Sequence, residues 1–131
     1  MPKRPSSALP ETLNESGADM KQWDVLMFPF SKEKRHPAVI LSNDETCQNG
    51  DLEHVNALLC TSASVNRPPK PTEVQLDEAD GLDWQTMVRC DKIYLLPKAQ
   101  FDDYKGSVTE ERRPLIARKM VEVLRLPIYR R

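Results

Sequence analysis

Prolines and turn dipeptides divide this chain into short apolar runs, and their spacing limits the folds that the chain can adopt. The 131 residues include 11 prolines, and Asn49-Gly50 and Asp80-Gly81 add two strong turn signals. The runs between these breaks are rich in β-branched residues and short for helices, so each is typical of a strand. We expect strands at 23–28, 38–42, 54–62, 72–77, 85–91 and 92–96, the last two either separate or joined into one.

The C-terminal segment has a helical pattern instead. Its apolar stripe precedes Pro127 and consists of Ile116, Met120, Val123 and Leu124. Ser107 and Glu110 have capping-box spacing, but Pro114 would kink a helix that began at Ser107. We expect either that kink or a helix that starts near Pro114. Five or six strands followed by one helix predict a mainly β fold, a small barrel or sandwich.

The overall composition indicates one folded domain without a broad basic surface. Hydrophobic residues make up 39% and charged residues 30%, which is typical of a globular chain and not of a disordered one. The net charge is −1, so any binding to nucleic acid would have to come from a local patch. Residues 1–20 are polar and rich in proline, and we expect a flexible leader there, followed by one domain over 21–131.

The cysteines and histidines do not form a metal-binding pattern. Cys47, Cys60 and Cys90 lack CxxC spacing, and His36 and His54 do not complete a zinc motif. Cys60 and Cys90 lie in apolar runs and are expected in the core. No run is long enough to cross a membrane, and no signal peptide is visible. We therefore expect a cytoplasmic protein that uses neither metal nor cofactor.

Arg89 and Asp91 stand two residues apart within an apolar run and are the first candidates for chemistry. Strand side chains alternate, so Val88 and Cys90 should face the core while Arg89 and Asp91 point outward together beside Met87. A guanidinium suits phosphate oxygens, and a neighbouring carboxylate can hold it or move a proton. The alternative is an ordinary exposed ion pair, worth less than about 1 kcal/mol.

Further candidates lie in loops and at one strand end. His36 follows Lys34 and Arg35 in a basic loop, and an imidazole can both take and give a proton near neutral pH. Thr61 and Ser62 end the third strand, where hydroxyl groups either bind phosphate or cap a turn. A basic groove is possible if the fold brings together Lys32, Lys34, Arg35, Arg67, Lys70 and Arg89. A solvated basic loop is the alternative.

Four segments resemble, in order and spacing, the PemK/MazF toxins of type II toxin–antitoxin systems. They are FPFSKEKRHPAVILSND, LLCTSAS, EVQLDEADGL and MVRCDKIYLL, and the resemblance runs from about residue 23 to residue 126. It implies an SH3-like barrel with a C-terminal helix, usually a homodimer that is bound by a cognate antitoxin. It also implies a metal-independent endoribonuclease that cuts single-stranded mRNA at short sequences and leaves a 2′,3′-cyclic phosphate.

The resemblance also implies roles for individual residues. Catalysis would fall to Arg89, Asp91, His36 and Arg35, and substrate binding to Thr61, Ser62, Arg67, Lys70 and Lys34. The loop over residues 65–71 would shape the RNA preference. Many family members have arginine directly before the strand-opening proline, whereas this chain has His36 there and Arg35 one position earlier.

Two alternatives to a nuclease follow from the same resemblance. A toxin of this fold could bind a protein target, as gyrase-poisoning relatives do, and cut nothing. A barrel that only binds RNA or an antitoxin, with catalysis lost, is the other. The RCD pair together with a histidine-bearing loop favours cleavage, and the replacement of the usual arginine by His36 keeps the inactive alternative open.

Overall fold

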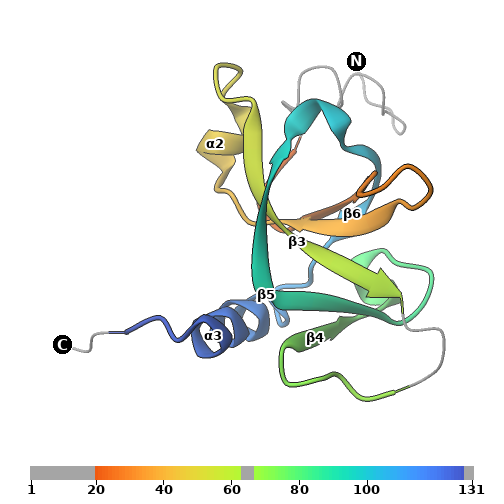
Figure 1. The fold of residues 1–131 in the computed structure, drawn as a ribbon, viewed down its shortest axis with the longest axis vertical. Helices are drawn as coiled ribbons and strands as arrows, with labels where there is room; N and C mark the ends of the chain where they lie inside the picture. Colours follow the sequence, from red (N-terminus) through yellow and green to blue (C-terminus); the bar gives the residue numbers. More distant parts are fainter. Residues whose placement is uncertain (1–19, 63–66, 129–131) are drawn as a thin grey trace.

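Six strands form one antiparallel sheet that curls into a small half-barrel, as Figure 1 shows. The computed structural model describes residues 20–62 and 67–128. The strands follow the order β4-β5-β3-β2-β1-β6 across the sheet. Their bounds are β1 Asp24–Phe28, β2 His36–Ile40, β3 His54–Ser62, β4 Glu73–Leu76, β5 Thr86–Pro97 and β6 Asp102–Ser107. The predicted mainly β barrel is therefore confirmed.

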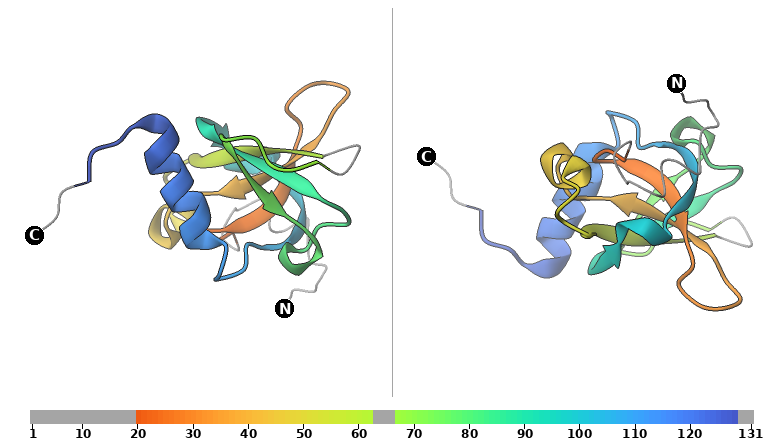
Figure 2. Two further views of the ribbon diagram at one scale, coloured as in Figure 1. Left: turned by 90° about the horizontal axis from the view of Figure 1, so that it is seen from below. Right: turned by 90° about the horizontal axis from the view of Figure 1, so that it is seen from above.

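Two helices and two short 3-10 turns complete the described part of the chain. They are α2 Asp44–Gln48, η1 Glu78–Asp80, η2 Lys98–Gln100 and α3 Arg113–Leu124. The helix α3 begins with Pro114 in its first turn, while Ser107 ends a strand, so the second of the two helix predictions is confirmed. Figure 2 shows α3 against one side of the sheet, where it contacts β4 and β5.

All the predicted strands are present, although β2 begins and ends two residues earlier than the expected 38–42. The runs at 85–91 and 92–96 are one continuous strand, β5. The strand β6 was not predicted, because its sequence DDYKGS lacks apolar alternation; pairing with β1 holds it, with register shifts around Leu26. The helix α2 lies where only a turn was expected, and it forms because the Asn43 side chain accepts a hydrogen bond from the Thr46 amide.

The core residues lie in two clusters on opposite faces of the sheet, since strand neighbours such as Ala38 and Val39 belong to different clusters. One contains the rings of Phe28 and Phe101, which lie 4.9 Å apart between centroids and are tilted by 60°. The other contains Cys60, Cys90 and Ile116, the last from α3. The predicted burial of both cysteines is confirmed, and burial raises the pKa of the Cys90 thiol to about 12.

Met87 was expected on the outer face of the sheet beside Arg89, and this expectation is wrong because the Met87 side chain is fully buried. The physical reason is a polar cover over this part of the face. The Gln85 amide, two residues earlier, donates to the Gln75 side chain at 2.7 Å and to the Arg67 carbonyl at 3.3 Å. Gln75 pairs with Met87 between β4 and β5, so these hydrogen bonds gather polar groups next to Met87 on this face.

Two glycines allow the end of η1 to touch β6, and we call this contact the seam. Gly81 has φ +94°, and a Cβ added there would lie 2.2 Å from the Lys105 carbonyl oxygen. A Cβ on Gly106 would lie 2.7 Å from the Asp80 carbonyl oxygen. Side chains at either position would force the two backbones apart, so only glycine fits both.

An ion-pair network fixes the seam from the α3 side. Asp80 is fully buried and accepts a 2.8 Å hydrogen bond from the Thr109 amide. The Arg112 guanidinium binds both oxygens of Asp77, at 2.8 and 3.0 Å, and also pairs with Asp80. The hydrogen bonds from Arg112 hold the pKa of the Asp77 carboxyl below its ordinary value.

The burial of Asp24 should make the stability of the protein depend on pH. This carboxyl is 6% exposed, and burial raises its pKa to about 6, although it accepts a 2.9 Å hydrogen bond from the Lys21 amide. The native state therefore binds the Asp24 proton more tightly than the unfolded state, and stability is gained as pH falls through 6. Between pH 7.5 and 5 the gain should be about 1.4 kcal/mol.

Urea unfolding of the wild type and of Asp24→Asn at both pH values checks this prediction. The variant cannot titrate at position 24, so its unfolding free energy should lack that increment, whereas the contributions of both histidines cancel in the comparison. Equal changes with pH in the two proteins would contradict it.

Candidate functional site

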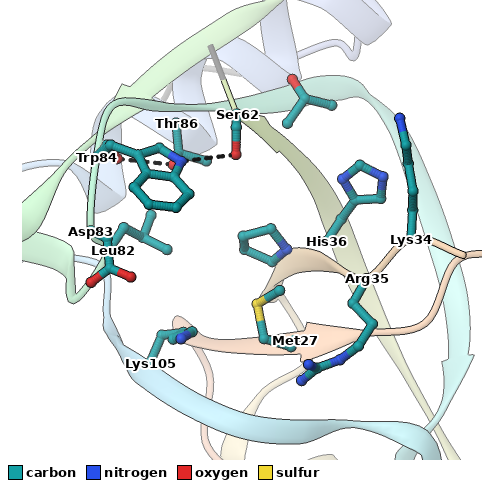
Figure 3. Close-up of a pocket in the computed structure, with 12 residues that line it drawn as sticks. Met27, Lys34, Arg35, His36, Ser62, Leu82, Asp83, Trp84, Thr86 and Lys105 are labelled. Atoms are coloured by element: carbon teal, nitrogen blue, oxygen red, sulfur yellow. Dashed lines mark hydrogen bonds between the residues drawn. The ribbon is translucent and has the colours of Figure 1, made fainter. Parts of the chain in front are cut away.

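A pocket of about 590 Å³ opens where the start of β2, the end of β3, the segment before β5 and the strand β6 approach one another (Figure 3). Its polar and charged lining consists of Lys34, Arg35, His36, Thr61, Ser62, Asp83, Thr86 and Lys105. Its apolar lining consists of Met27, Pro37, Leu82 and Trp84. Five of the residues predicted from the sequence therefore meet in one pocket.

His36 is held in place by the strand that it opens. It is the first residue of β2, pairs with Phe28 of β1, and is half-buried. Its ring lies 6.0 Å from the ring of Phe30, which in turn packs against Tyr94 at 5.3 Å. Pro37 follows directly and restricts the backbone of His36 to extended conformations. The imidazole thus occupies a defined position at the edge of the pocket.

The hydroxyl side of the pocket is built by the pairing of β3 with β5. Thr61 pairs with Met87 and Ser62 with Thr86. The Ser62 hydroxyl oxygen accepts a 3.0 Å hydrogen bond from the indole nitrogen of Trp84. Thr61 and Ser62 thus stand at the pocket as predicted, and the Ser62 hydroxyl retains its own proton for a ligand.

Carboxylates of β6 form ion pairs with two of the cationic side chains that line the pocket. The Arg35 guanidinium pairs with Asp102 and lies 3.8 Å from Asp103. The Lys105 ammonium lies 3.3 Å from the same Asp103 carboxylate. Within residues 20–62 and 67–128, Lys34 makes no ion pair. Three cationic side chains, Lys34, Arg35 and Lys105, therefore line the pocket, and β6 carboxylates offset the charge of the last two.

The structure does not bring the other predicted residues into this pocket. Arg89 and Asp91 do share one face, and their side chains form a 3.3 Å ion pair at 39% and 29% exposure. Arg89 lies three residues along β5 from Thr86, about 10 Å at the rise of a strand. Arg89 and Asp91 therefore do not line this pocket within a single chain, and their catalytic roles stay predictions.

The basic loop after β3 is also engaged elsewhere. Arg67 forms a bidentate pair with Glu73 at 2.8 and 3.2 Å, and this bond lowers the pKa of the Glu73 carboxyl. The Lys70 amide donates to the same carboxylate at 2.9 Å. Residues 65 and 66 of the predicted specificity loop lie outside the described residues. The binding roles predicted for Arg67 and Lys70 stay predictions.

Sequence reasoning missed four polar or aromatic residues of the lining: Asp83, Trp84, Thr86 and Lys105. Asp83 and Trp84 follow the Asp80-Gly81 turn, and a large aromatic side chain next to a turn is the signal that could have marked them. Lys105 lies on the strand that was not predicted. Among the described residues no three His, Cys, Asp or Glu side chains gather as a metal site would require, and none of their helices is long and apolar enough to span a membrane.

Comparison with known structures identifies relatives of the same fold. An endoribonuclease from Mycobacterial species, in complex with its cognate antitoxin, has a TM-score of 0.68 and 26% identity over 83% of this chain and 98% of that chain. The toxin MazF-mt6 of Mycobacterium tuberculosis has a TM-score of 0.67 and 21% identity, over 80% and 99%. A chain of a MazE-MazF structure from Deinococcus radiodurans has a TM-score of 0.65 and 19% identity, over 82% of this chain and 97% of that chain.

The last two similarities establish the fold alone, because their sequence identities are low. No curated protein matches the chain significantly. A comparison with protein families matches residues 21–124 to the family described as PemK-like, MazF-like toxin of type II toxin-antitoxin system. This match covers most of the chain and agrees with the half-barrel and its C-terminal helix. The chain therefore belongs to the PemK-like, MazF-like toxins of type II toxin–antitoxin systems.

Proposed function

We propose that this toxin is a metal-independent endoribonuclease that cuts single-stranded mRNA and leaves a 2′,3′-cyclic phosphate. The observation that carries the proposal is the meeting of an imidazole, two hydroxyl groups and cationic side chains, Lys34 and Arg35, in one pocket. These are the groups that RNA transesterification needs, namely a proton acceptor, hydrogen-bond donors for the phosphate and positive charge for the transition state. The 26% identical endoribonuclease supports the same activity.

The roles of the residues follow from their positions. His36 takes the proton from the attacking 2′-hydroxyl, and the 2′-oxygen bonds to the adjacent phosphorus. Thr61 and Ser62 donate to the phosphate oxygens, and Lys34 and Arg35 stabilise the added negative charge. The bond from phosphorus to the 5′-oxygen then breaks, and the leaving oxygen takes a proton from solvent at the open side of the pocket. No step requires a metal ion.

The partners in this proposal are RNA, a second copy and an antitoxin. Relatives of this fold occur as complexes with a cognate antitoxin or with MazE. We propose that a cognate antitoxin places acidic side chains against the cationic side chains of the pocket, Lys34 foremost, and thereby inhibits cleavage. We also propose that the toxin is a homodimer and acts in the cytoplasm, where mRNA is found.

The direct test is to incubate the purified protein with a long RNA in excess EDTA. New 5′-hydroxyl ends and 2′,3′-cyclic phosphate ends at a short recurrent sequence are the expected products. Cleavage that disappears with EDTA and returns with a divalent cation would refute metal independence. Absence of cleavage under both conditions would favour the two alternatives without catalysis, a toxin that binds a protein target or an inactive binding barrel.

Replacing Arg89 with alanine separates two interpretations of the Arg89–Asp91 pair. Because Arg89 does not line the pocket, we expect Arg89→Ala to lower kcat/KM for RNA less than about 10-fold, through a lost phosphate contact only. The measurement is cleavage of one RNA by the variant and the wild type at several salt concentrations. A loss of about 100-fold or more would instead place Arg89 at the reacting phosphate, contributed by a second copy.

A further inference from the structure

Trp84 is the most conspicuous exposed aromatic residue of the pocket. Its side chain is 59% exposed, although an indole gains more from burial than almost any other side chain. It is nevertheless held in position, since its indole nitrogen donates to Ser62 and its backbone carbonyl accepts a 3.1 Å hydrogen bond from the Thr86 hydroxyl. A large aromatic surface is thus kept open to solvent in a fixed orientation.

The surroundings of Trp84 indicate what its face contacts. Figure 3 shows Trp84 and His36 on opposite sides of the pocket, with Ser62 on the same side as the indole. The cavity of about 590 Å³ between them is large enough for a nucleobase and its sugar. An aromatic plane beside cationic side chains is the arrangement with which proteins bind single-stranded nucleic acid, because bases stack on the ring while phosphates meet the positive charge.

We propose that Trp84 is the base-stacking platform of the pocket and determines which nucleobase is accepted beside the cut phosphate. This inference rests on the proposed function, because it assigns one base of the RNA to the indole while His36 faces the adjoining phosphate. The hydrogen bond to Ser62 links the platform to the hydroxyl groups that bind the phosphate, so base and phosphate are fixed relative to each other. Trp84 is thereby a specificity residue, and it takes no part in proton transfer.

The test uses the fluorescence of Trp84 and a nucleic acid that cannot be cut. The chain has two tryptophans, and Trp23 packs against the core, so Trp23→Phe leaves Trp84 as the single reporter. The probes are 2′-deoxy oligonucleotides in four pools, each enriched in one base. We expect binding to quench Trp84 fluorescence, with one pool binding best.

Variants at Trp84 should change this binding in a graded manner. With binding measured by the fluorescence anisotropy of a dye-labelled oligonucleotide, Trp84→Ala should weaken binding of the best pool about 5- to 150-fold, the range for loss of one stacking interaction. Trp84→Phe, which keeps a ring but loses the bond to Ser62, should retain most of the affinity. Tyr104→Ala removes an aromatic residue that is 48% exposed but does not line the pocket, and it should bind as the wild type does.

Each of the following outcomes would contradict the proposed role of Trp84 as a base-stacking platform. Binding without quenching, or undiminished binding by Trp84→Ala, would remove Trp84 from recognition while RNA cleavage by the wild type left the proposed function intact. Quenching by the co-purified antitoxin but not by any pool would assign Trp84 to a protein interface. If cleavage maps of Trp84→Ala and wild type on one long RNA shared every site and relative rate, the proposed role in base selection would be wrong.

Discussion

His36→Ala is expected to reduce RNA cleavage about 100-fold or more, the usual effect of removing a group that transfers a proton in the transition state. The loss should fall on kcat, because His36 is one of many lining residues and its removal leaves the hydroxyl groups and cationic side chains that bind RNA. Single-turnover cleavage of a short RNA with the enzyme in excess gives this rate directly.

The chain offers a matched control for this substitution in its other histidine. His54 begins β3 and is exposed, whereas Thr61 and Ser62 stand at the far end of the same strand. His54→Ala should therefore keep the wild-type rate. Wild-type activity in His36→Ala would remove the imidazole from the reaction and would direct attention to Arg35 and the hydroxyl groups.

Gly81→Ala is expected to destabilise the barrel by about 3–5 kcal/mol. Part of the cost is the left-handed backbone at φ +94°, which disfavours a side chain by about 1–2 kcal/mol. The rest is the clash of the added Cβ with the Lys105 carbonyl oxygen, which belongs to a paired strand and cannot move away without opening the seam. Urea unfolding gives the difference from the midpoint and slope of the transition.

Gly50→Ala is the corresponding control. A Cβ at Gly50 would meet no atom within 4 Å, so this variant should equal the wild type or exceed it in stability by up to about 1 kcal/mol. If both variants unfolded at the same urea concentration, the seam would contribute nothing to stability. Failure of Gly81→Ala to fold, with Gly50→Ala folded, would agree with the largest expected loss, because whole domains are stable by only about 5–15 kcal/mol.

Much of the fold could be predicted because local patterns in the sequence agree with the tertiary structure. The run HVNALLCTS is bounded by turn residues and forms β3 with the predicted limits. Pro114 excluded a straight helix from Ser107, and α3 does begin beside it. The strand β6 could not be predicted in this way, since its residues are mostly polar and it is held by backbone pairing to β1, which no local pattern records.

The candidate site was predictable only where it lies close to a strand end. His36, Thr61 and Ser62 were identified because prolines and turns mark those ends, and they do meet in one pocket. Strand alternation correctly placed Arg89 and Asp91 on one face, but alternation gives the face of a side chain and not its position along the strand, so it could not say whether Arg89 lies near His36. Trp84 and Lys105 enter the pocket through the seam, a contact between segments distant in sequence.

At the seam, a residue that the fold requires, Gly81, lies close in sequence to the residue proposed to select the base, Trp84. Gly81 is confined by the opposing backbone, whereas Trp84, three positions later, is largely exposed and substitutions of such side chains usually change stability by less than about 0.5 kcal/mol. Related toxins could therefore diverge in the RNA sequences that they recognise through changes at this rim while the barrel stays intact.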